Sequence, residues 1–117
     1  MMRNKKILIV EDERIIASVY SILLNKKGCD VSIAANVRDA INKTKEFNPD
    51  LIIMDIQLNE PSSGIDVARQ IRADGYACQI IFTTGNLRKQ TLQEVADITN
   101  CSVLIKPVEF SEIEKFL

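Results

Sequence analysis

The stretch Leu51-Ile52-Ile53-Met54-Asp55 decides the fold of this 117-residue chain. Four apolar residues lead directly into one carboxylate. Pro49 and Asp50 precede them, and the turn-forming residues 59–64 follow. A continuous apolar run of this length is typical of a parallel strand that is covered on both faces. Ligands of open α/β sheets bind beyond the carboxyl ends of such strands. The position of Asp55 therefore predicts a functional site rather than a core residue.

Four further short apolar runs share this character and alternate with segments of helical spacing. The predicted strands cover residues 7–10, 31–34, 51–54, 80–82 and 103–105. Each is followed by a predicted helix, and the connections between them are short. This alternation is typical of the α/β class. We therefore expect one domain, residues 1–117, with a doubly wound five-stranded parallel sheet that carries helices on both faces.

Local signals place the predicted helices. The first has one apolar stripe, and its N-terminus lies near Asp12 or Glu13. Asn36 is the expected N-cap of the second, and Gly64 precedes the third. The last begins with a capping-box pattern from Ser111 to Glu114. Apolar residues at helical spacing mark the expected inner face of three of these helices. They are Ile15, Ile16, Val19, Ile22 and Leu23 in the first helix; Ile65, Val67, Ala68 and Ile71 in the third; and Leu87, Leu92, Val95, Ala96 and Ile98 in the fourth.

Composition limits the classes of function. The chain has 15 basic and 16 acidic residues and a net charge of −1, which gives no sign of a nucleic-acid surface. No apolar run approaches the roughly 20 residues that span a bilayer, and residues 7–10 are too short for the core of a signal peptide. We therefore expect a cytoplasmic chain that makes no direct contact with nucleic acid or membrane.

Cysteine and histidine usage argues against several kinds of site. Cys29, Cys78 and Cys101 are widely spaced and form no CxxC pair, and the chain has no histidine. A zinc site is therefore not expected, and small buried thiols in a reducing compartment are the favoured interpretation. Without histidine, the chain cannot supply a histidine base, nucleophile or phosphohistidine of its own.

Chemically distinctive residues follow four of the predicted strands. Glu11 and Asp12 follow the first strand, Asp55 the third, Thr84 the fourth and Lys106 the fifth. In a right-handed doubly wound sheet these strand ends lie at one edge. Each residue alone has a simpler explanation, such as a charge at a helix N-terminus, an ordinary turn or a solvated lysine. Their occurrence together at one edge favours a common site.

The predicted cluster of carboxylates needs a compensating charge. Converging carboxylates repel one another, and one becomes protonated unless a cation neutralises the group. Oxygen ligands without histidine or cysteine suit Mg²⁺, which keeps several waters and accepts one or two carboxylates. Lys106 adds a fixed positive charge and Thr84 a hydroxyl donor. A tetrahedral anion beside Asp55 could be held by all three.

These motifs, in this order, resemble the receiver domain of two-component response regulators over essentially the whole chain. Residues 7–13 look like the acidic motif at the end of the first strand, and Asp55 looks like the phosphoacceptor. Thr84-Gly85 resembles the switch hydroxyl and the small residue after it. Lys106-Pro107 resembles the family's Lys-Pro pair, whose peptide bond is cis. The resemblance implies a flavodoxin-like sheet with strand order 2-1-3-4-5 and a shortened last helix.

The resemblance also implies a metal site. Asp12 and Asp55 would bind Mg²⁺ directly, with the backbone carbonyl of Gln57 as a third protein ligand. Glu11 would act mostly through metal-bound water. The domain would assist its own phosphorylation and dephosphorylation without being an enzyme in any other sense.

The implied function is that of a phosphoacceptor switch. A phosphoryl group would pass to Asp55 from a phosphohistidine on a sensor histidine kinase or a phosphotransfer protein. Lys106 would pair first with Asp55 and then with the phosphoryl group, Thr84 would move to bond a phosphoryl oxygen, and Gly85 would leave room beside it. The surface of helix 4, strand 5 and helix 5 would then change for an unknown output domain or protein, and it is also a common dimer face in the family.

Three features depart from the family pattern. Asn59 stands where a proline is usual, and the spacing from Asp55 to Gly64 is one residue longer than the commonest form. Val103 occupies the position of the aromatic switch residue, so an output would have to be read in another way. Receivers also usually continue several residues beyond Leu117. We therefore expect the receiver part of a longer regulator or hybrid histidine kinase.

Other functions remain open on the residues alone. A flavodoxin-like small-molecule binding module would use the same sheet, but the chain has no Gly-rich phosphate loop and no tryptophan. A phosphohydrolase with an aspartyl nucleophile would want a second carboxylate close after Asp55, where Gln57 stands. A receiver that cannot be phosphorylated is disfavoured by the complete set of acidic, threonine and lysine residues.

Overall fold

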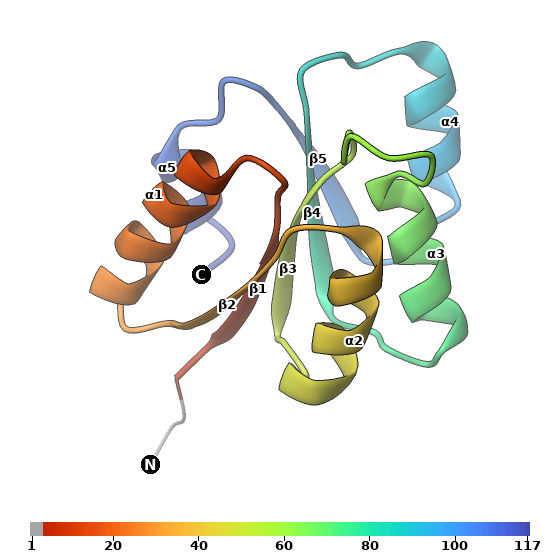
Figure 1. The fold of residues 1–117 in the computed structure, drawn as a ribbon. Coiled ribbons are helices and arrows are strands. Elements are labelled where there is room, and N and C mark those ends of the chain that lie inside the picture. Colours follow the sequence, from red (N-terminus) through yellow and green to blue (C-terminus); the bar gives the residue numbers. More distant parts are fainter. Residues whose placement is uncertain (1–3) are drawn as a thin grey trace.

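The computed structural model describes residues 4–117, which form a five-stranded sheet between two layers of helices (Figure 1). The strands are β1 (Lys6–Val10), β2 (Asp30–Ala34), β3 (Leu51–Asp55), β4 (Gln79–Thr84) and β5 (Cys101–Ile105). The helices are α1 (Arg14–Lys26), α2 (Val37–Phe47), α3 (Gly64–Ala73), α4 (Lys89–Ala96) and α5 (Phe110–Glu114). All neighbouring strands pair in parallel, in the order β2-β1-β3-β4-β5. The predicted flavodoxin-like fold and strand order are confirmed.

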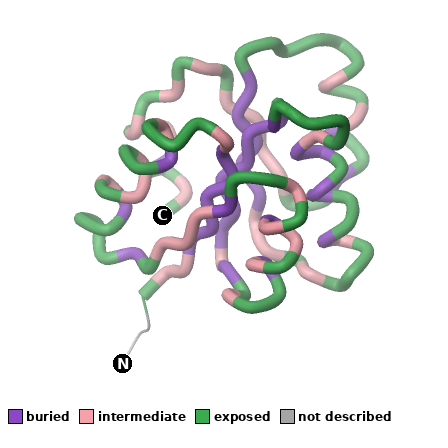
Figure 2. The backbone as a smooth tube through the Cα atoms, in the orientation of Figure 1, coloured by how far each residue is buried: buried purple, intermediate pink, exposed green. Residues whose placement is uncertain are grey.

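Alternate residues of the central strands face different helices. Leu8, Ile52 and Phe82 pack in the core on the side of α2, α3 and α4, whereas Ile9 and Ile53 pack on the side of α1 and α5 (Figure 1). Figure 2 shows the strands as the buried centre of the molecule, and every residue of β3 is buried. Burial on both faces explains why β3 has a continuous apolar run instead of an alternating one.

The apolar stripe predicted for α1 is only partly buried. Ala17 and Leu24 are the buried residues of this helix, whereas Ile15, Val19 and Ile22 are exposed by 81%, 48% and 56%. Helical spacing identifies apolar positions, but α1 has more of them than its inner face can hold. The side facing the sheet is selected by packing against β1 and β2, which a local pattern does not contain.

The predicted boundaries of α4 and α5 were wrong by a few residues. Leu87 and Ile98 lie outside α4, which begins after the extended residue Arg88. The capping box of α5 joins Glu109 and Glu112 instead of Ser111 and Glu114. A glutamate carboxylate can accept the backbone N–H bond that a serine hydroxyl accepts, so the helix begins earlier in the chain than the sequence pattern indicated.

The caps of α2 and α3 agree with the sequence. The Asn36 side chain accepts a hydrogen bond from the backbone N–H of Asp39 at 2.9 Å, as predicted for an N-cap. Ser63 and Asp66 form a reciprocal capping box at the start of α3. The expected inner face of α3, from Ile65 to Ile71, is buried. No helix within residues 4–117 is long and apolar enough to cross a bilayer.

Arg72 stabilises the N-terminal edge of the sheet, which lies opposite the edge that carries Glu11, Asp55 and Lys106. Its guanidinium donates to the backbone carbonyls of Tyr76, Cys78, Thr99 and Asn100 at distances between 2.7 and 3.3 Å. These carbonyls belong to the segments that enter β4 and β5. One side chain at the end of α3 therefore fixes the start of two strands.

Gly64 fixes the distance between α3 and the end of β3. A Cβ atom on Gly64 would overlap the backbone carbonyl oxygen of Asp55 and would come within 2.8 Å of the Met54 side chain. The backbone N–H of Gly64 also donates to the carbonyl of Ile56 at 2.9 Å. Only glycine therefore allows this close approach. In the preceding loop, Asn59 has a φ of 42°, which the proline ring excludes, so the loop needs a residue other than proline there.

A substitution at Gly64 tests this close approach. Helix propensity alone predicts that Gly64→Ala stabilises the protein by about 1 kcal/mol. The steric overlap with Asp55 predicts the opposite sign, a loss of about 1–3 kcal/mol. Urea unfolding followed by circular dichroism measures the difference. Gly85→Ala is the matched control, because its Cβ would meet nothing within 4 Å, and its effect should stay within about 0.5 kcal/mol. An unchanged or raised stability of Gly64→Ala would contradict the packing argument.

Candidate functional site

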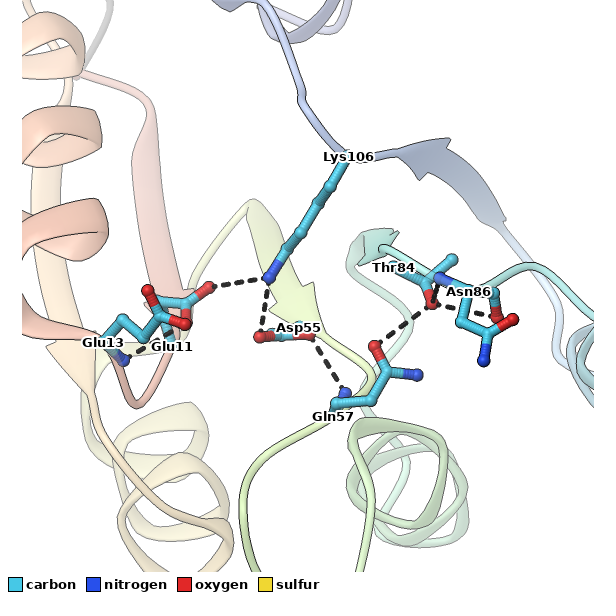
Figure 3. Close-up of polar contacts among 7 residues, drawn as sticks. All are labelled: Glu11, Glu13, Asp55, Gln57, Thr84, Asn86 and Lys106. Carbon is cyan, nitrogen blue, oxygen red and sulfur yellow. Dashed lines mark hydrogen bonds and ion pairs between the residues drawn. The ribbon is translucent and has the colours of Figure 1, made fainter.

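The strand register brings the predicted residues to one edge of the sheet. Val10 pairs with Met54, Asp55 pairs with Thr83, and Thr84 pairs with Ile105. The strand ends are therefore level, and the residues at or just after them face one another. Figure 3 shows these side chains as they converge from four separate strands. They are Glu11 after β1, Asp55 at the end of β3, Thr84 at the end of β4 and Lys106 after β5.

Lys106 lies at the centre of the charges. Its Nζ atom is 2.9 Å from Oδ2 of Asp55 and 3.7 Å from Oε2 of Glu11 (Figure 3). Both carboxylates are 4% exposed. Burial lowers the pKa of Lys106, but the hydrogen bond to Asp55 and the charges of Asp55 and Glu11 outweigh it and raise the pKa overall. The ammonium therefore stays charged and compensates part of the buried negative charge.

One ammonium does not balance the acidic group. Carboxylate oxygens of Glu11, Asp12 and Asp55 lie within 4.8 Å of one another. Burial, followed by the charge of Asp55, raises the pKa of Glu11 from 4.5 to about 7. Near neutral pH the cluster therefore gains from a second cation. Three oxygen donors with no histidine or cysteine fit Mg²⁺ by the chemistry of the donor set.

Backbone N–H groups orient two of the carboxylates. Gln57 N–H donates to Oδ1 of Asp55 at 3.0 Å, and Glu13 N–H donates to Oε1 of Glu11 at 3.2 Å (Figure 3). Each donor lies two residues after its acceptor, so the loop that leaves each strand holds the carboxylate of that strand. With Lys106 on Oδ2, both oxygens of Asp55 have a donor.

The site opens to solvent through a shallow hollow of about 530 Å³. Asp12, Asp55, Gln57, Gly85 and Lys106 line it, together with Glu13 and Asn59. A group the size of a phosphate could therefore approach Asp55 from outside without a change in the fold.

Thr84 is close to this group but is bonded elsewhere. It is fully buried, and its hydroxyl donates to Oε1 of Gln57 at 3.1 Å (Figure 3). The same hydroxyl oxygen accepts from the backbone N–H of Asn86 at 3.1 Å. The structure therefore places Thr84 at the edge of the site, in contact with the loop that follows β4.

The remaining residues named from the sequence lie around the site. Gly85 lines the hollow, and the peptide bond between Lys106 and Pro107 is cis. Val103 is half-buried and packs against the core on the side of α4 instead of facing the carboxylates. Only its place in the family pattern had identified Val103, as the position of the aromatic switch residue.

Sequence reasoning missed two contributions to the site. Gly64, which sets the position of the Asp55 backbone, was read only as a helix start, although a glycine at a helical position is itself a signal of close approach. The side chain of Gln57 was used only to argue against a phosphohydrolase, and only its backbone carbonyl was expected to act at the site. Its contact with Thr84 joins residues 27 positions apart, for which a single sequence contains no local signal.

Relatives with curated descriptions are response regulators. The chain is 36% identical over 81 residues to the alkaline phosphatase synthesis transcriptional regulatory protein PhoP of Bacillus subtilis, which covers 69% of this chain and 33% of PhoP. It is 35% identical over 100 residues to the regulatory protein LuxO of Vibrio vulnificus, which covers 86% of this chain and 22% of LuxO. The chain therefore spans between about a fifth and a third of the length of these relatives.

Solved structures with the same fold cover nearly the whole chain. The chemotaxis protein CheY4 of Vibrio cholerae superposes with a TM-score of 0.88 at 24% identity, over 97% of this chain and 95% of CheY4, which establishes the fold alone. The response regulator TrrA of Thermotoga maritima, in complex with Mg²⁺ and BeF, superposes with a TM-score of 0.82 at 28% identity, over 96% of this chain and 95% of TrrA.

The family model for the response regulator receiver domain matches residues 7–117. This range contains nearly all of β1 and every element after it, including each residue that lines the hollow. The protein chain therefore belongs to the receiver domain family of two-component response regulators.

Proposed function

We propose that Asp55 is the phosphoacceptor of this receiver domain. The observation that carries the proposal is the contact of 2.9 Å between Lys106 Nζ and Asp55 Oδ2, with the carboxylates of Glu11 and Asp12 within reach. In the transfer, a carboxylate oxygen of Asp55 forms a bond to phosphorus while the phosphorus–nitrogen bond of a phosphohistidine breaks. The imidazole nitrogen of the donor keeps the electron pair. The phosphohistidine of the donor lies outside residues 1–117, because this stretch has no histidine.

The geometry serves this reaction by positioning and charge compensation, which supply most of the catalysis in phosphoryl transfer. Lys106 holds Oδ2 of Asp55 and follows the negative charge as it moves onto the phosphoryl oxygens. The Gln57 N–H fixes Oδ1. Thr84 supplies a hydroxyl donor for a phosphoryl oxygen after it leaves its present partner, and Gly85 keeps the approach free of a side chain.

We propose Mg²⁺ as the second cation. Asp12, Asp55 and the backbone carbonyl of Gln57 would bind it, and Glu11 would contact it through water. When bound, the ion neutralises the phosphoryl oxygens and the acidic cluster together. Support comes from the donor set of the cluster and from TrrA, a receiver of the same fold that is described in complex with Mg²⁺ and BeF.

The wider role follows from the same proposal. The partners are a sensor histidine kinase or a phosphotransfer protein, and an output domain or protein that reads the phosphorylated state. The domain contacts no nucleic acid or membrane itself, acts in the cytoplasm, and promotes only its own phosphorylation and dephosphorylation. A homodimer through α4 and β5 fits the exposed side chains of Leu92 and Ile105.

Replacement of Asp55 tests the acceptor directly. Incubation with acetyl phosphate and Mg²⁺ should add the mass of one phosphoryl group to the wild-type chain, and Asp55→Asn should abolish the addition, since an amide oxygen is too weak a nucleophile. Intact-protein mass spectrometry over time measures both. Asp97→Asn, at an exposed position after α4, should label like the wild type. Labelling of Asp55→Asn at the wild-type rate would show that the acceptor lies elsewhere.

Replacement of Lys106 separates metal binding from phosphoryl recognition. Lys106→Met should still bind Mg²⁺, because the carboxylates remain, but should bind beryllofluoride, a phosphoryl mimic, roughly tenfold or more weakly, since a charge-assisted hydrogen bond is lost. Calorimetric titration with each ligand measures both affinities. Lys45→Met, at an exposed position of α2, is the control. Equal beryllofluoride affinity in Lys106→Met and wild type would remove Lys106 from the site.

The raised pKa of Glu11 predicts an unusual dependence of stability on pH. The folded chain holds a proton on Glu11 up to about pH 7, whereas the unfolded chain loses it near 4.5. In the absence of divalent ions, the contribution of Glu11 to the free energy of unfolding is therefore largest below pH 4.5 and declines by about 1–3 kcal/mol as the pH rises to 7. Mg²⁺ should restore stability most strongly at the upper end of this window.

Urea unfolding between pH 4.5 and 7.5, with EDTA or with Mg²⁺, measures this dependence. Glu11→Gln should remove most of the decline, whereas Glu46→Gln, at an exposed position of α2, should leave it in place. A stability that rises with pH through this window in EDTA, and that owes nothing to Glu11, would refute the prediction.

A further inference from the structure

We propose that the side chain of Gln57 is a latch that holds Thr84 in the resting state, and that phosphorylation of Asp55 has to break this contact. The proposal rests on the proposed function of Asp55. It assigns to Gln57 a positioning role that is separate from its backbone carbonyl. Gln57 acts through Thr84, and the contact that carries the proposal is the hydrogen bond of 3.1 Å from the Thr84 hydroxyl to Oε1 of Gln57 (Figure 3).

The Thr84 hydroxyl has one proton to donate. Thr84 is 0% exposed, so solvent does not offer an alternative acceptor. The hydroxyl faces two acceptors, Oε1 of Gln57 at 3.1 Å and the backbone carbonyl of Asn86 at 3.3 Å. A bond to a phosphoryl oxygen on Asp55 needs the same proton. The resting contact and the phosphorylated contact therefore exclude each other.

The Gln57 side chain can move away from Thr84. Thr84 is buried in β4, whereas Gln57 is exposed in the loop after β3 and lines the hollow beside Asp55. Its amide can exchange the Thr84 hydroxyl for water at little cost. Thr84 is therefore the fixed end of the latch, and Gln57 is the end that moves. The latch disfavours the phosphorylated state by the free energy of one exchanged hydrogen bond.

The Gln57 latch lies between two hollows. Gln57 lines the one that contains Asp55, and it also lines a second hollow of about 340 Å³ against α4. Asn86 and Arg88, which lead into α4, line the second hollow as well. The Asn86 backbone N–H donates to the Thr84 hydroxyl oxygen at 3.1 Å. A movement of Thr84 away from Gln57 therefore alters the loop between β4 and α4 as well as the wall between the hollows.

This contact supplies a route to α4 that needs no aromatic side chain. Val103 is half-buried among core residues and has no ring that could turn between two positions. The polar chain from Gln57 through Thr84 to Asn86 instead joins the acceptor site to the start of α4 by hydrogen bonds. The conformation of the loop between β4 and α4 therefore depends on whether Thr84 is bonded to Gln57.

A double-mutant cycle tests the latch. Gln57→Met keeps the size of the side chain without an amide, and Gln57→Asn keeps the amide but is one methylene too short to reach Thr84. Each is made with Thr84 and with Thr84→Val. Calorimetry measures beryllofluoride affinity at saturating Mg²⁺, so that differences in metal affinity do not enter. Methyl NMR of labelled threonine follows Thr84 without and with beryllofluoride.

Both single variants should bind beryllofluoride between about twofold and tenfold more tightly than wild type, the worth of one net hydrogen bond. In the Thr84→Val background the same changes should have no effect, because the hydroxyl that the latch holds is absent. The Thr84 methyl signal of each ligand-free single variant should move from its wild-type position toward that of the loaded wild type, a readout that a merely structural role of Gln57 would not produce.

Each other outcome has a definite meaning. Equal or weaker binding by Gln57→Met, with an unmoved Thr84 methyl signal, overturns the latch. A gain that persists with Thr84→Val also overturns it, because Gln57 would then act on the ligand directly. A wild-type chain that binds no beryllofluoride overturns the proposed function, and the latch fails with it. If the wild type binds beryllofluoride and the Gln57 variants bind it with the same affinity, the latch is overturned and the proposed function is not.

Discussion

The contact between Lys106 and Asp55 depends on an excess of buried negative charge. Glu11 and Asp55 are each 4% exposed. Among the described residues, their charged partner is the ammonium of Lys106, which lies 2.9 Å from Asp55 and 3.7 Å from Glu11. Buried carboxylates need a compensating cation or hydrogen-bond donors, because burial disfavours charge. The raised pKa of Glu11 is the sign that compensation is incomplete. The site therefore favours further positive charge, and under the proposed function a phosphoryl group would add negative charge beside Lys106.

The fold makes this concentration of charge possible by backbone geometry. Parallel pairing in level register brings the ends of β1, β3, β4 and β5 side by side, although the residues there are up to 95 positions apart in the sequence, from Glu11 to Lys106. Gly64 then presses the start of α3 against the carbonyl of Asp55, and backbone N–H groups hold the carboxylates. The repulsion between these like charges is offset by the hydrophobic free energy of the sheet, which is buried on both faces.

The sequence predicts what depends on local pattern and misses what depends on packing. Apolar runs such as residues 51–54 located the strands, and the polar residues that follow them were brought together as expected. Exposure of Ile15 was not foreseeable, because helical spacing does not say which side meets the sheet. The contacts of Arg72 with four carbonyls, and of Gln57 with Thr84, join segments that only the folded chain brings close. Such contacts are fixed by tertiary geometry, and one sequence read alone carries no trace of them.

Burial also decides which groups can respond to phosphorylation. Asp55 and Thr84 are buried, so water screens a new charge on Asp55 less than it would at the surface, although the hollow beside Asp55 is open to solvent. Under the proposed function, two groups that line the hollow can respond to that charge, the ammonium of Lys106 and the amide of Gln57. Lys106 is tied to Asp55 in the resting state and only has to follow the charge. Gln57 has to give up its partner, and that partner lies at the end of the strand that leads to α4. With valine at position 103, a rearrangement of polar contacts is the change that we propose carries the signal away from Asp55.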